Sequence, residues 1–234
     1  MRRVFRLAAL PYEVRVISPF LFALPVVVAI ALGGLASILD IRHSVSEHYV
    51  ADLFVATVEA CLPLATGIAL AYLAARDSAV ELLLTLPVPY RAIAFRRFAL
   101  IVGWSGGVAL ATALLLHIAL PWSLPKTMLE QQLIWLAPLL WLGALGALLA
   151  LLLRGSAIAG TLLGLIWIIQ LAFHGFFEGN GWTQPWYLFA TINVPNAPYW
   201  TANRLELIGT AVVAGAAVWI YLRNAEWRLR SEEK

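Results

Sequence analysis

Residues 132–153, QLIWLAPLLWLGALGALLALLL, decide the fold, because no side chain in this run is charged. The run is about as long as the 20 apolar residues that an α-helix needs to cross the hydrocarbon core of a bilayer. Five further runs resemble it, so the six predicted spans are 17–38, 52–75, 95–120, 132–153, 156–174 and 205–223. None shows the two-residue alternation of a membrane barrel, and backbone groups have to be paired in hydrocarbon. The sequence therefore predicts six transmembrane helices.

The composition agrees with a membrane protein. Hydrophobic residues make up 62% of the chain and charged residues only 12%, and the mean hydropathy is +0.84. These values exceed the apolar share of an ordinary soluble domain. We find no domain boundary or internal repeat, so residues 1–234 are expected to form one all-α membrane domain. The lone Cys61 has no partner for a disulfide within the chain.

The basic residues predict the orientation. In a six-span arrangement one side carries Arg2, Arg3, Arg6, Arg15, Arg76, Arg91, Arg96, Arg97, Arg154, Arg223, Arg228, Arg230 and Lys234. The other side carries only Arg42, Lys126 and Arg204. By the positive-inside rule both termini are cytoplasmic. The net charge of +3 then reflects orientation and contact with lipid headgroups, and we expect no nucleic-acid partner.

Two segments outside the spans carry further predictions. Residues 1–16 place Arg2, Arg3 and Arg6 on one helical face, which is typical of a helix lying in the membrane interface. No small-x-small cleavage site follows this segment, so we do not expect a signal peptide. Residues 175–203 are rich in Gly, Pro, Trp and Asn and are too long for a simple turn between the last two spans.

Residues 76–91, RDSAVELLLTLPVPYR, form a charged segment between two apolar runs. Ser78 and Glu81 make an S-x-x-E capping box, and an apolar stripe follows at helical spacing. Pro87 and Pro89 limit the helix to about two turns. A helix this short is marginal alone. We therefore predict a short docking helix at about 77–86 that lies on the membrane and contacts a partner protein.

The run ELLLTLPV at 81–88, followed by Arg91, Arg96 and Arg97, resembles the E-L-L-L-(S/T)-L-P-V segment of type 2 ABC transporter permeases. In that family the segment is the cytoplasmic coupling helix, and it sits in a cleft of a separate ATPase subunit. The chain departs from the family where Gly-Thr is replaced by Ala79-Val80 and Gly-Lys by Arg96-Arg97. These departures leave the substrate subgroup open.

The resemblance implies partners and roles. No G-x-x-x-x-G-K-(S/T) loop occurs in the chain, so ATP and Mg would be bound by a partner ATPase, in two copies, and this chain would hold no cofactor. A second permease subunit, the same or related, is expected in the cytoplasmic membrane of a prokaryote. The family places an elbow helix at the N-terminus and short re-entrant helices before the last span. The residues that would contact the ATPase are Arg76, Asp77, Glu81, Leu83, Leu84, Pro87 and Arg91.

Polar side chains within the spans are the candidates for a translocation path. Glu59 lies well inside the second span, and an intramembrane carboxylate costs about 2.5–3.5 kcal/mol at a helix centre. It either faces the translocation path or is a hydrogen-bonded group between helices. Gln170, His117 and His174 are further candidates, although interhelical bonding or interface solvation is the more ordinary role for a glutamine. No histidine spacing matches a metal-ligand motif.

Gly160 and Gly164 form a G-x-x-x-G pair in the fifth span, and this spacing lets two helix backbones approach closely. The approaching helix belongs either to a second permease subunit or to the same chain. Related permeases use the first and fifth spans for the dimer contact, and this resemblance favours the subunit contact.

The function expected from the resemblance is a permease subunit of an ATP-driven exporter, with an apolar or amphipathic cargo. A non-transporting scaffold or sensor subunit docked to an ATPase is an alternative, and so is a permease similar to the haem exporters. An intramembrane enzyme would need a motif such as G-x-S-x-G or H-E-x-x-H, and the chain contains neither. We therefore expect no catalytic residues in this chain.

Overall fold

The computed structural model describes residues 17–41, 47–75, 90–119 and 127–232. Over these residues the chain is helical and contains no strand, which confirms the prediction of an all-helical fold. The long helices are α2 (Pro19–Ile41), α3 (Glu47–Ala56), α4 (Leu62–Ala75), α6 (Tyr90–Ala119), α7 (Met128–Leu153), α8 (Ser156–Ala172) and α11 (Trp200–Glu232). The π-helical turn η2 (Thr57–Cys61) joins α3 to α4.

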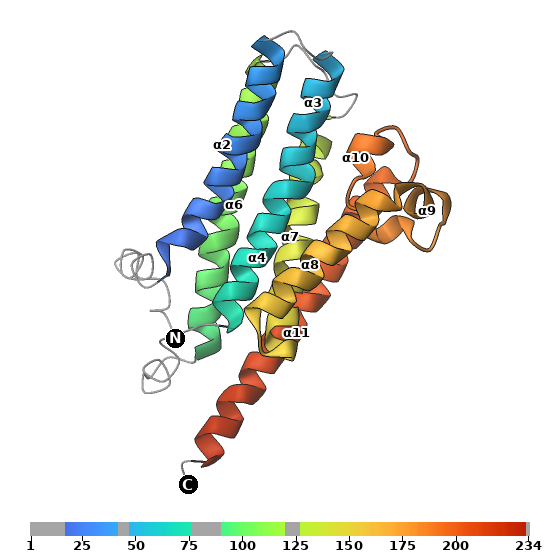
Figure 1. Cartoon of the computed structure of the whole chain (residues 1–234). Helices are drawn as coiled ribbons and strands as arrows, with labels where there is room; N and C mark the ends of the chain where they lie inside the picture. The colour runs from blue at the N-terminus through green and yellow to red at the C-terminus, as the bar shows by residue number, and fades with distance from the viewer. Residues whose placement is uncertain (1–16, 42–46, 76–89, 120–126, 233–234) are drawn as a thin grey trace.

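The long helices alternate in direction along the bundle, with α3, η2 and α4 together forming one of them (Figure 1). The start of α2, the end of α4, the start of α6 and the end of α11 all lie at one end. Such alternation keeps sequential helices adjacent, as short connections require. The two described helix ends that flank residues 76–89 are therefore at the same end of the bundle as the C-terminal part of α11.

Within the part of the chain that the structure describes, four helices are long and apolar enough to cross a membrane: Asp52–Ala75, Tyr90–Leu115, Leu129–Leu153 and Trp200–Arg223. Two shorter apolar stretches, Pro19–Leu35 within α2 and Ser156–Ala172, which is α8, fall on the other two predicted ranges. At about 1.5 Å per residue, α8 is about 25 Å long, less than the roughly 30 Å hydrocarbon core. The structure thus supports a membrane protein with four such helices, and the count of six spans stays a prediction.

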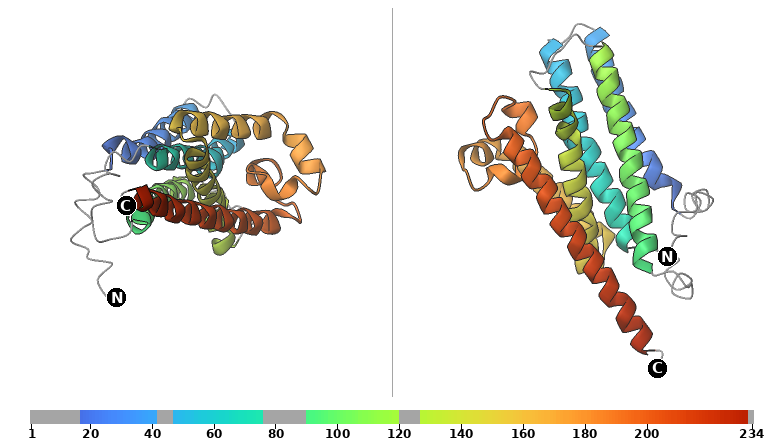
Figure 2. Two further views of the ribbon diagram at one scale, coloured as in Figure 1. Left: turned by 90° about the horizontal axis from the view of Figure 1, so that it is seen from below. Right: turned by 180° about the vertical axis from the view of Figure 1, so that it is seen from behind.

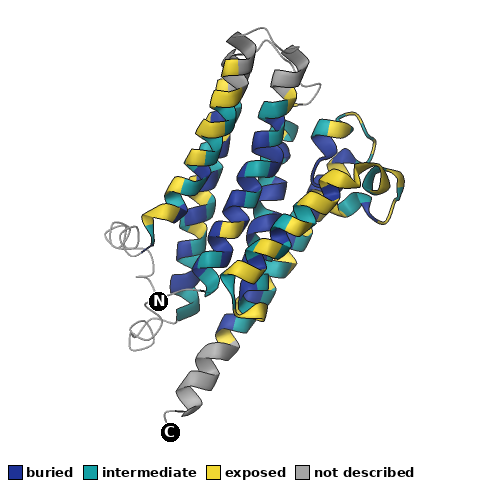
Figure 3. Cartoon of the chain, viewed as in Figure 1, coloured by how far each residue is buried: buried dark blue, intermediate teal, exposed yellow. Residues whose placement is uncertain are grey.

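Helices α4 and α7 pack closely against each other in the interior of the bundle. Figure 3 shows buried residues along most of α4. A Cβ atom added at Gly146 would lie 2.3 Å from the carbonyl oxygen of Gly67, and one at Gly67 would lie 2.8 Å from that of Leu142. Both glycines are therefore required by close backbone contact between the two helices. This close approach within the chain uses Gly67 and Gly146, a pair that the sequence analysis did not identify.

Local sequence determines where α7 begins and ends. The side chain of Thr127 accepts the N–H of Glu130, and the carboxylate of Glu130 accepts the N–H of Thr127 at 2.8 Å, a complete capping box. Arg154 ends the helix in the left-handed conformation at φ 53°, and extended Gly155 precedes α8. This sharp turn allows α8 to return beside α7.

Between α8 and α11 the chain forms three short helices, α9 (His174–Gly179), the 3₁₀ turn η3 (Gln184–Trp186) and α10 (Ala190–Asn193). We call residues 173–199 the cap. The cap lies beside one half of the bundle in Figure 1, away from the C-terminal part of α11. The re-entrant arrangement of this segment stays a prediction.

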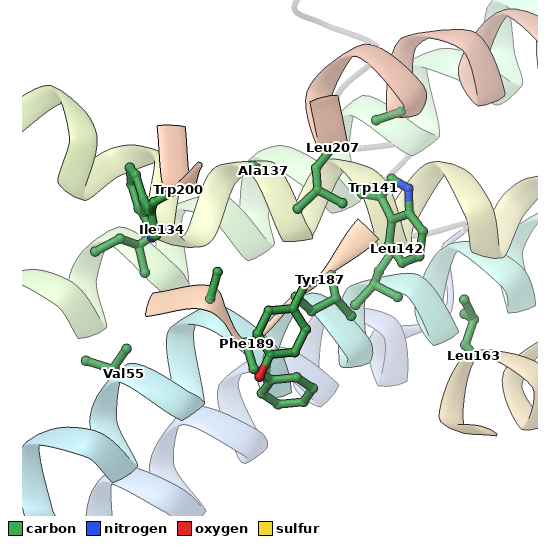
Figure 4. Close-up of a cluster of buried hydrophobic side chains, with 14 residues drawn as sticks. Val55, Ile134, Ala137, Trp141, Leu142, Leu163, Tyr187, Phe189, Trp200 and Leu207 are labelled. Carbon is green, nitrogen blue, oxygen red and sulfur yellow. The ribbon is translucent and has the colours of Figure 1, made fainter. Parts of the chain in front are cut away.

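The cap shares the main hydrophobic core with the long helices. Tyr187 and Phe189 are buried between α7, which carries Ile134 and Leu142, and α3, which carries Val55 (Figure 4). Large aromatic side chains bury much apolar area, so this packing stabilises the cap against the bundle. The cap is thus part of the folded core and not a simple surface loop.

Two predicted segments lie outside the described ranges. These are the interfacial helix at 1–16 and the coupling helix at 77–86, and both stay predictions.

The last helix begins at Trp200, earlier than the predicted 205, so the segment between the last two helices is shorter than the predicted 175–203. This shift brings Arg204, which we expected on a loop, into α11.

Candidate functional site

Glu59 lies in the π-helical turn η2, in the middle of a long continuous helix. The N–H of Leu62 donates to the carbonyl of Thr57, five residues earlier. Pro63 follows and has no N–H for the carbonyl four residues before it, so a regular α-helical hydrogen-bond ladder cannot continue here. Such π-turns occur frequently at functional sites. The local sequence thus gives the helix an irregular turn at the carboxylate.

The carboxylate of Glu59 is wholly buried and joins two other elements. It accepts the N–H of Thr191 at 2.8 Å and the N–H of Ile192 at 3.2 Å, both in the first turn of α10. It also forms an ion pair with the guanidinium of Arg204 from α11. Both charged side chains are 0% exposed. One carboxylate therefore connects the second long helix, the cap and the last helix.

Arg204 has further partners on its cap side. Its guanidinium donates to the hydroxyl of Thr191 at 3.0 Å and to the carbonyl of Leu188 at 3.3 Å. The ring of Trp200, one turn earlier in α11, lies 5.4 Å from the guanidinium carbon, and its Nε1–H donates to the same threonine hydroxyl at 3.0 Å. The charge is thus held by an anion, two oxygen acceptors and an aromatic face.

Two amide side chains bind neighbouring backbone groups of the cap. Oε1 of Gln170, on α8, accepts the N–H of Leu188 at 2.8 Å. Nδ2 of Asn203, on α11, donates to the carbonyls of Gln184 at 2.6 Å and Tyr187 at 3.0 Å. Three long helices therefore bond directly to the cap. We call the five side chains that make these bonds the cap junction: Glu59, Gln170, Thr191, Asn203 and Arg204.

A second polar cluster lies within the cap. The hydroxyl of Tyr187 donates to Glu178 at 3.1 Å and accepts from the amide of Asn193. Burial raises the pKa of the Tyr187 phenol, the nearby Glu178 carboxylate raises it further, and the hydrogen bond from Asn193 lowers it. The net shift is upward, so the phenol stays protonated and available as a donor. Nδ1 of His174 lies 3.5 Å from the same carboxylate at the exposed edge of the cap.

The chemistry of the cap junction is that of attachment. A buried charge pair returns its desolvation cost only when additional hydrogen bonds accompany it. The two backbone donors to Glu59 and the oxygen acceptors of Arg204 supply such bonds, whereas Nε of Arg204 has no hydrogen-bond partner among the described residues. The carboxylate oxygens of Glu59 are occupied by backbone donors and Arg204. Among the described residues no group of three or more His, Cys, Asp or Glu side chains is placed to hold a metal ion. The junction fixes one arrangement of the cap on the bundle.

The four residues predicted to line a translocation path do not lie together in the structure. Glu59 and Gln170 come together, because each binds the same stretch of cap backbone. His174 lies apart from them at the exposed surface. His117 lies in α6, and its side chain is outside the described part of the chain. Two of the four candidates thus belong to one buried network.

The predicted dimer-contact glycines are half-buried on α8, with open space at their Cβ positions. An added Cβ at Gly164 would meet nothing within 4 Å, and one at Gly160 would meet only Ile68, at 4.0 Å. Neighbouring apolar side chains on the same helix, among them Ile158, Leu165 and Ile168, are exposed. Within the described chain these glycines make no close helix contact, so the face is open to another protein or to lipid.

Most of the predicted ATPase-contact residues lie outside the described ranges: Arg76, Asp77, Glu81, Leu83, Leu84 and Pro87. Arg91 is described, in the first turn of α6. Its guanidinium carbon lies 5.1 Å from the ring centre of Trp219 on α11. Arg91 therefore connects the beginning of α6 with the C-terminal half of the last helix.

Sequence reasoning did not find the partners of Glu59. It placed Arg204 among the few basic residues on the far side of the membrane, although this arginine follows the start of an apolar helix by one turn. The sequence did contain one signal for this pairing: a single carboxylate in one predicted span and a single arginine at the edge of another. Buried charges are usually paired, so these two residues were candidates for an ion pair. Thr191 and Asn203 carried no comparable signal.

Comparisons with known proteins add no assignment to this geometry: no family model, no curated protein and no solved structure matches the chain. The interpretation of the site therefore rests on its own contacts and on the sequence.

Proposed function

We propose that this chain is the membrane-spanning permease subunit of an ATP-driven exporter that resembles the type 2 ABC family. The observation that carries the proposal is the sequence ELLLTLPV at 81–88 between two apolar helices. The ends of α4 and α6 that flank it lie together at one end of the bundle (Figure 1). A docking segment at this place could pass movement of an ATPase to both helices.

The distribution of charge supports the same orientation. Arg91, Arg97, Arg154 and Arg223 belong to the end of the bundle at which α4 ends and α6 begins, and the cap lies toward the other end. By the positive-inside rule the first end is cytoplasmic, which is where an ATPase subunit would bind. ATP and Mg would be held by that partner, in two copies.

A second permease subunit would complete the transporter. The outward face of α8 with Gly160 and Gly164 is apolar and open, and small residues at this spacing permit close packing of two helices. The cap junction would hold the far side of each subunit rigid while the helices move. The cargo expected from the apolar interior is a lipid-like molecule, a hydrophobic peptide or a drug.

The test is substrate-stimulated ATP hydrolysis by the reconstituted complex. Glu81→Lys or Leu83→Asp is expected to lower stimulation strongly while the variants still insert into the membrane. Glu206→Lys, a charge reversal at an exposed position near the cap, is the matched control and should keep normal stimulation. Normal coupling in both docking variants would refute the docking assignment.

One observation favours a second candidate, a non-transporting sensor or scaffold subunit docked to an ATPase. Glu59 and Gln170, the two buried residues predicted to line a path, are both engaged by the cap. A chain that moves no cargo would show this arrangement. ATP-dependent accumulation of an apolar dye in inverted vesicles supports the exporter, whereas coupled ATP hydrolysis without any transport supports the sensor.

A further inference from the structure

An apolar groove lies between α6 and α11, with α7 and α4 at its floor. Its volume is about 270 Å³, close to the lower limit of about 300 Å³ for small-molecule pockets. Figure 2 shows the two helices in the view from behind, converging toward the end at which α6 begins. Every lining residue is apolar, among them Phe95 on α6 and Ile208, Val212, Gly215 and Val218 on α11. Nothing in the lining would recognise a polar ligand.

The groove is about as long as one leaflet of a bilayer. On α11 it extends from Ile208 to Val218, which at about 1.5 Å per residue is about 15 Å. The hydrocarbon core of a bilayer is about 30 Å thick, so one leaflet contributes about 15 Å. Both helices that border the groove are long and apolar enough to cross a membrane. A single acyl chain of one leaflet fits this length and this chemistry.

One end of the groove is aromatic and basic. Phe95 and Trp219 meet edge to face with ring centres 5.0 Å apart, and Arg91 lies over the same tryptophan. Arg91 precedes Phe95 by one turn on α6, and Arg223 follows Trp219 by one turn on α11. Arg91 and Arg223 thus lie on α6 and α11 just beyond the apolar part of the groove. Tryptophan and arginine are enriched where membrane helices meet lipid headgroups.

We propose that this groove binds one anionic phospholipid, with an acyl chain along α6 and α11 and its phosphate between Arg91 and Arg223. The charge at one end distinguishes this lipid from a neutral one, because basic residues at a membrane surface attract anionic headgroups. The inference needs only that these helices lie in a membrane. It is independent of the proposed function, since a sensor subunit could hold the same lipid.

Two glycines on α11 offer a matched pair of variants. An added Cβ at Gly215, in the groove, or at Gly209, outside its lining, would meet nothing within 4 Å. Gly215→Leu therefore fills the groove without a clash at Cβ, and Gly209→Leu makes the same change on an exposed face. Val212→Phe, at an exposed residue of the groove wall, is a second blocking variant if Gly215→Leu does not fold.

The experiment is native mass spectrometry of the full chain in mild detergent, with phosphatidylglycerol or phosphatidylcholine added. We expect the wild type and Gly209→Leu to retain phosphatidylglycerol about tenfold better than phosphatidylcholine. Gly215→Leu should reduce retention of both lipids about tenfold. Replacing both arginines by glutamine should remove the preference and keep the weaker binding. Circular dichroism verifies that each variant is helical.

Three results would overturn the proposal. The first is equal retention of the two lipids by the wild type. The second is unchanged retention by both Gly215→Leu and Val212→Phe, since a filled groove cannot hold the chain. The third is efficient cross-linking of Gly215→Cys between two copies of the chain in membranes with no lipid retained, which would make the groove a contact between subunits.

Discussion

The last helix, α11, takes part in two contacts of opposite character. Its first turn, with Trp200, Asn203 and Arg204, joins the cap through a buried charge pair and hydrogen bonds. Its middle, from Ile208 to Val218, borders a groove of apolar side chains. Hydrogen bonds and ion pairs have fixed directions, whereas apolar contacts do not. The first contact therefore specifies one arrangement, and the second leaves room for a changing neighbour.

This difference gives each contact its own response to substitution. At the cap junction, removing one group leaves its partner buried and unpaired, which is costly. In the groove, adding a side chain fills space that a lipid would occupy. The contact of α4 with α7 shares a property with each of the other two. It is apolar, as the groove is, but its glycines leave no room for an added atom, so its geometry is as fixed as that of the cap junction. Substitutions at the cap junction, at the α4–α7 contact and in the groove should therefore change the stability of the protein by different amounts.

The largest effect is expected at the buried charge pair. Glu59→Gln leaves the guanidinium of Arg204 buried without its anion, and breaking a buried pair in this way costs about 3–5 kcal/mol. Thermal unfolding in detergent should show a large loss of stability. Glu206→Gln, an exposed change on α11, should have almost no effect. A double variant, Glu59→Leu with Arg204→Met, removes both charges but leaves the N–H groups of Thr191 and Ile192 without their acceptor, so it should recover only part of the loss.

A smaller loss is expected where α4 and α7 approach. Gly146→Ala would place a Cβ 2.3 Å from the carbonyl oxygen of Gly67, so a backbone has to move. Overpacking of this kind costs about 1–3 kcal/mol. Gly215→Ala is the matched change in open space, where replacing glycine in a helix gains up to about 1 kcal/mol. Opposite signs in chemical denaturation distinguish the two sites, and equal effects would refute the close packing.

The next effect concerns a single hydrogen bond of the cap junction. Gln170→Leu removes the acceptor of the Leu188 N–H, and an unsatisfied buried donor costs about 1–3 kcal/mol. The loss should appear as faster proteolysis within the cap as well as a lower melting temperature. Leu171→Met, at the exposed neighbouring position, is the control. Undiminished protection of the cap would show that Gln170 does not hold it.

The smallest effect is a pH dependence from Tyr187. Its pKa is raised in the folded protein above the ordinary value of 10.0, so the folded state keeps its proton where the unfolded state loses it. The stabilisation is present below about pH 10 and is lost as the pH rises further. The melting temperature of Tyr187→Phe should fall less between pH 9 and 11 than that of the wild type. Parallel curves would exclude this contribution.

The sequence predicted helices better than it predicted their partners. Each of the six apolar runs coincides with a helix, because length and the absence of charge depend on the run alone. Residues that act across long separations were harder. Glu59 was identified as unusual, but its pairing with Arg204 and with the backbone of α10 depends on how the cap folds over the bundle.

The contacts of the glycines were also hard to predict from the sequence. Gly160 and Gly164 form a recognisable motif, yet an added Cβ at either position would meet nothing closer than 4.0 Å in the described chain. Gly67 and Gly146 lie on different helices and form no local pattern, yet they touch. Close approach between helices depends on tertiary register, which no single stretch of sequence contains.

The most direct test of the proposed permease is affinity purification of the tagged chain in mild detergent, with identification of the bound proteins and an ATPase assay. We expect a P-loop ATPase to copurify with the wild type and with Glu206→Lys and to be lost with Glu81→Lys. Recovery of the chain without any nucleotide-binding partner, or equal recovery of the ATPase with Glu81→Lys, would show that residues 76–91 are not the docking element of a transporter.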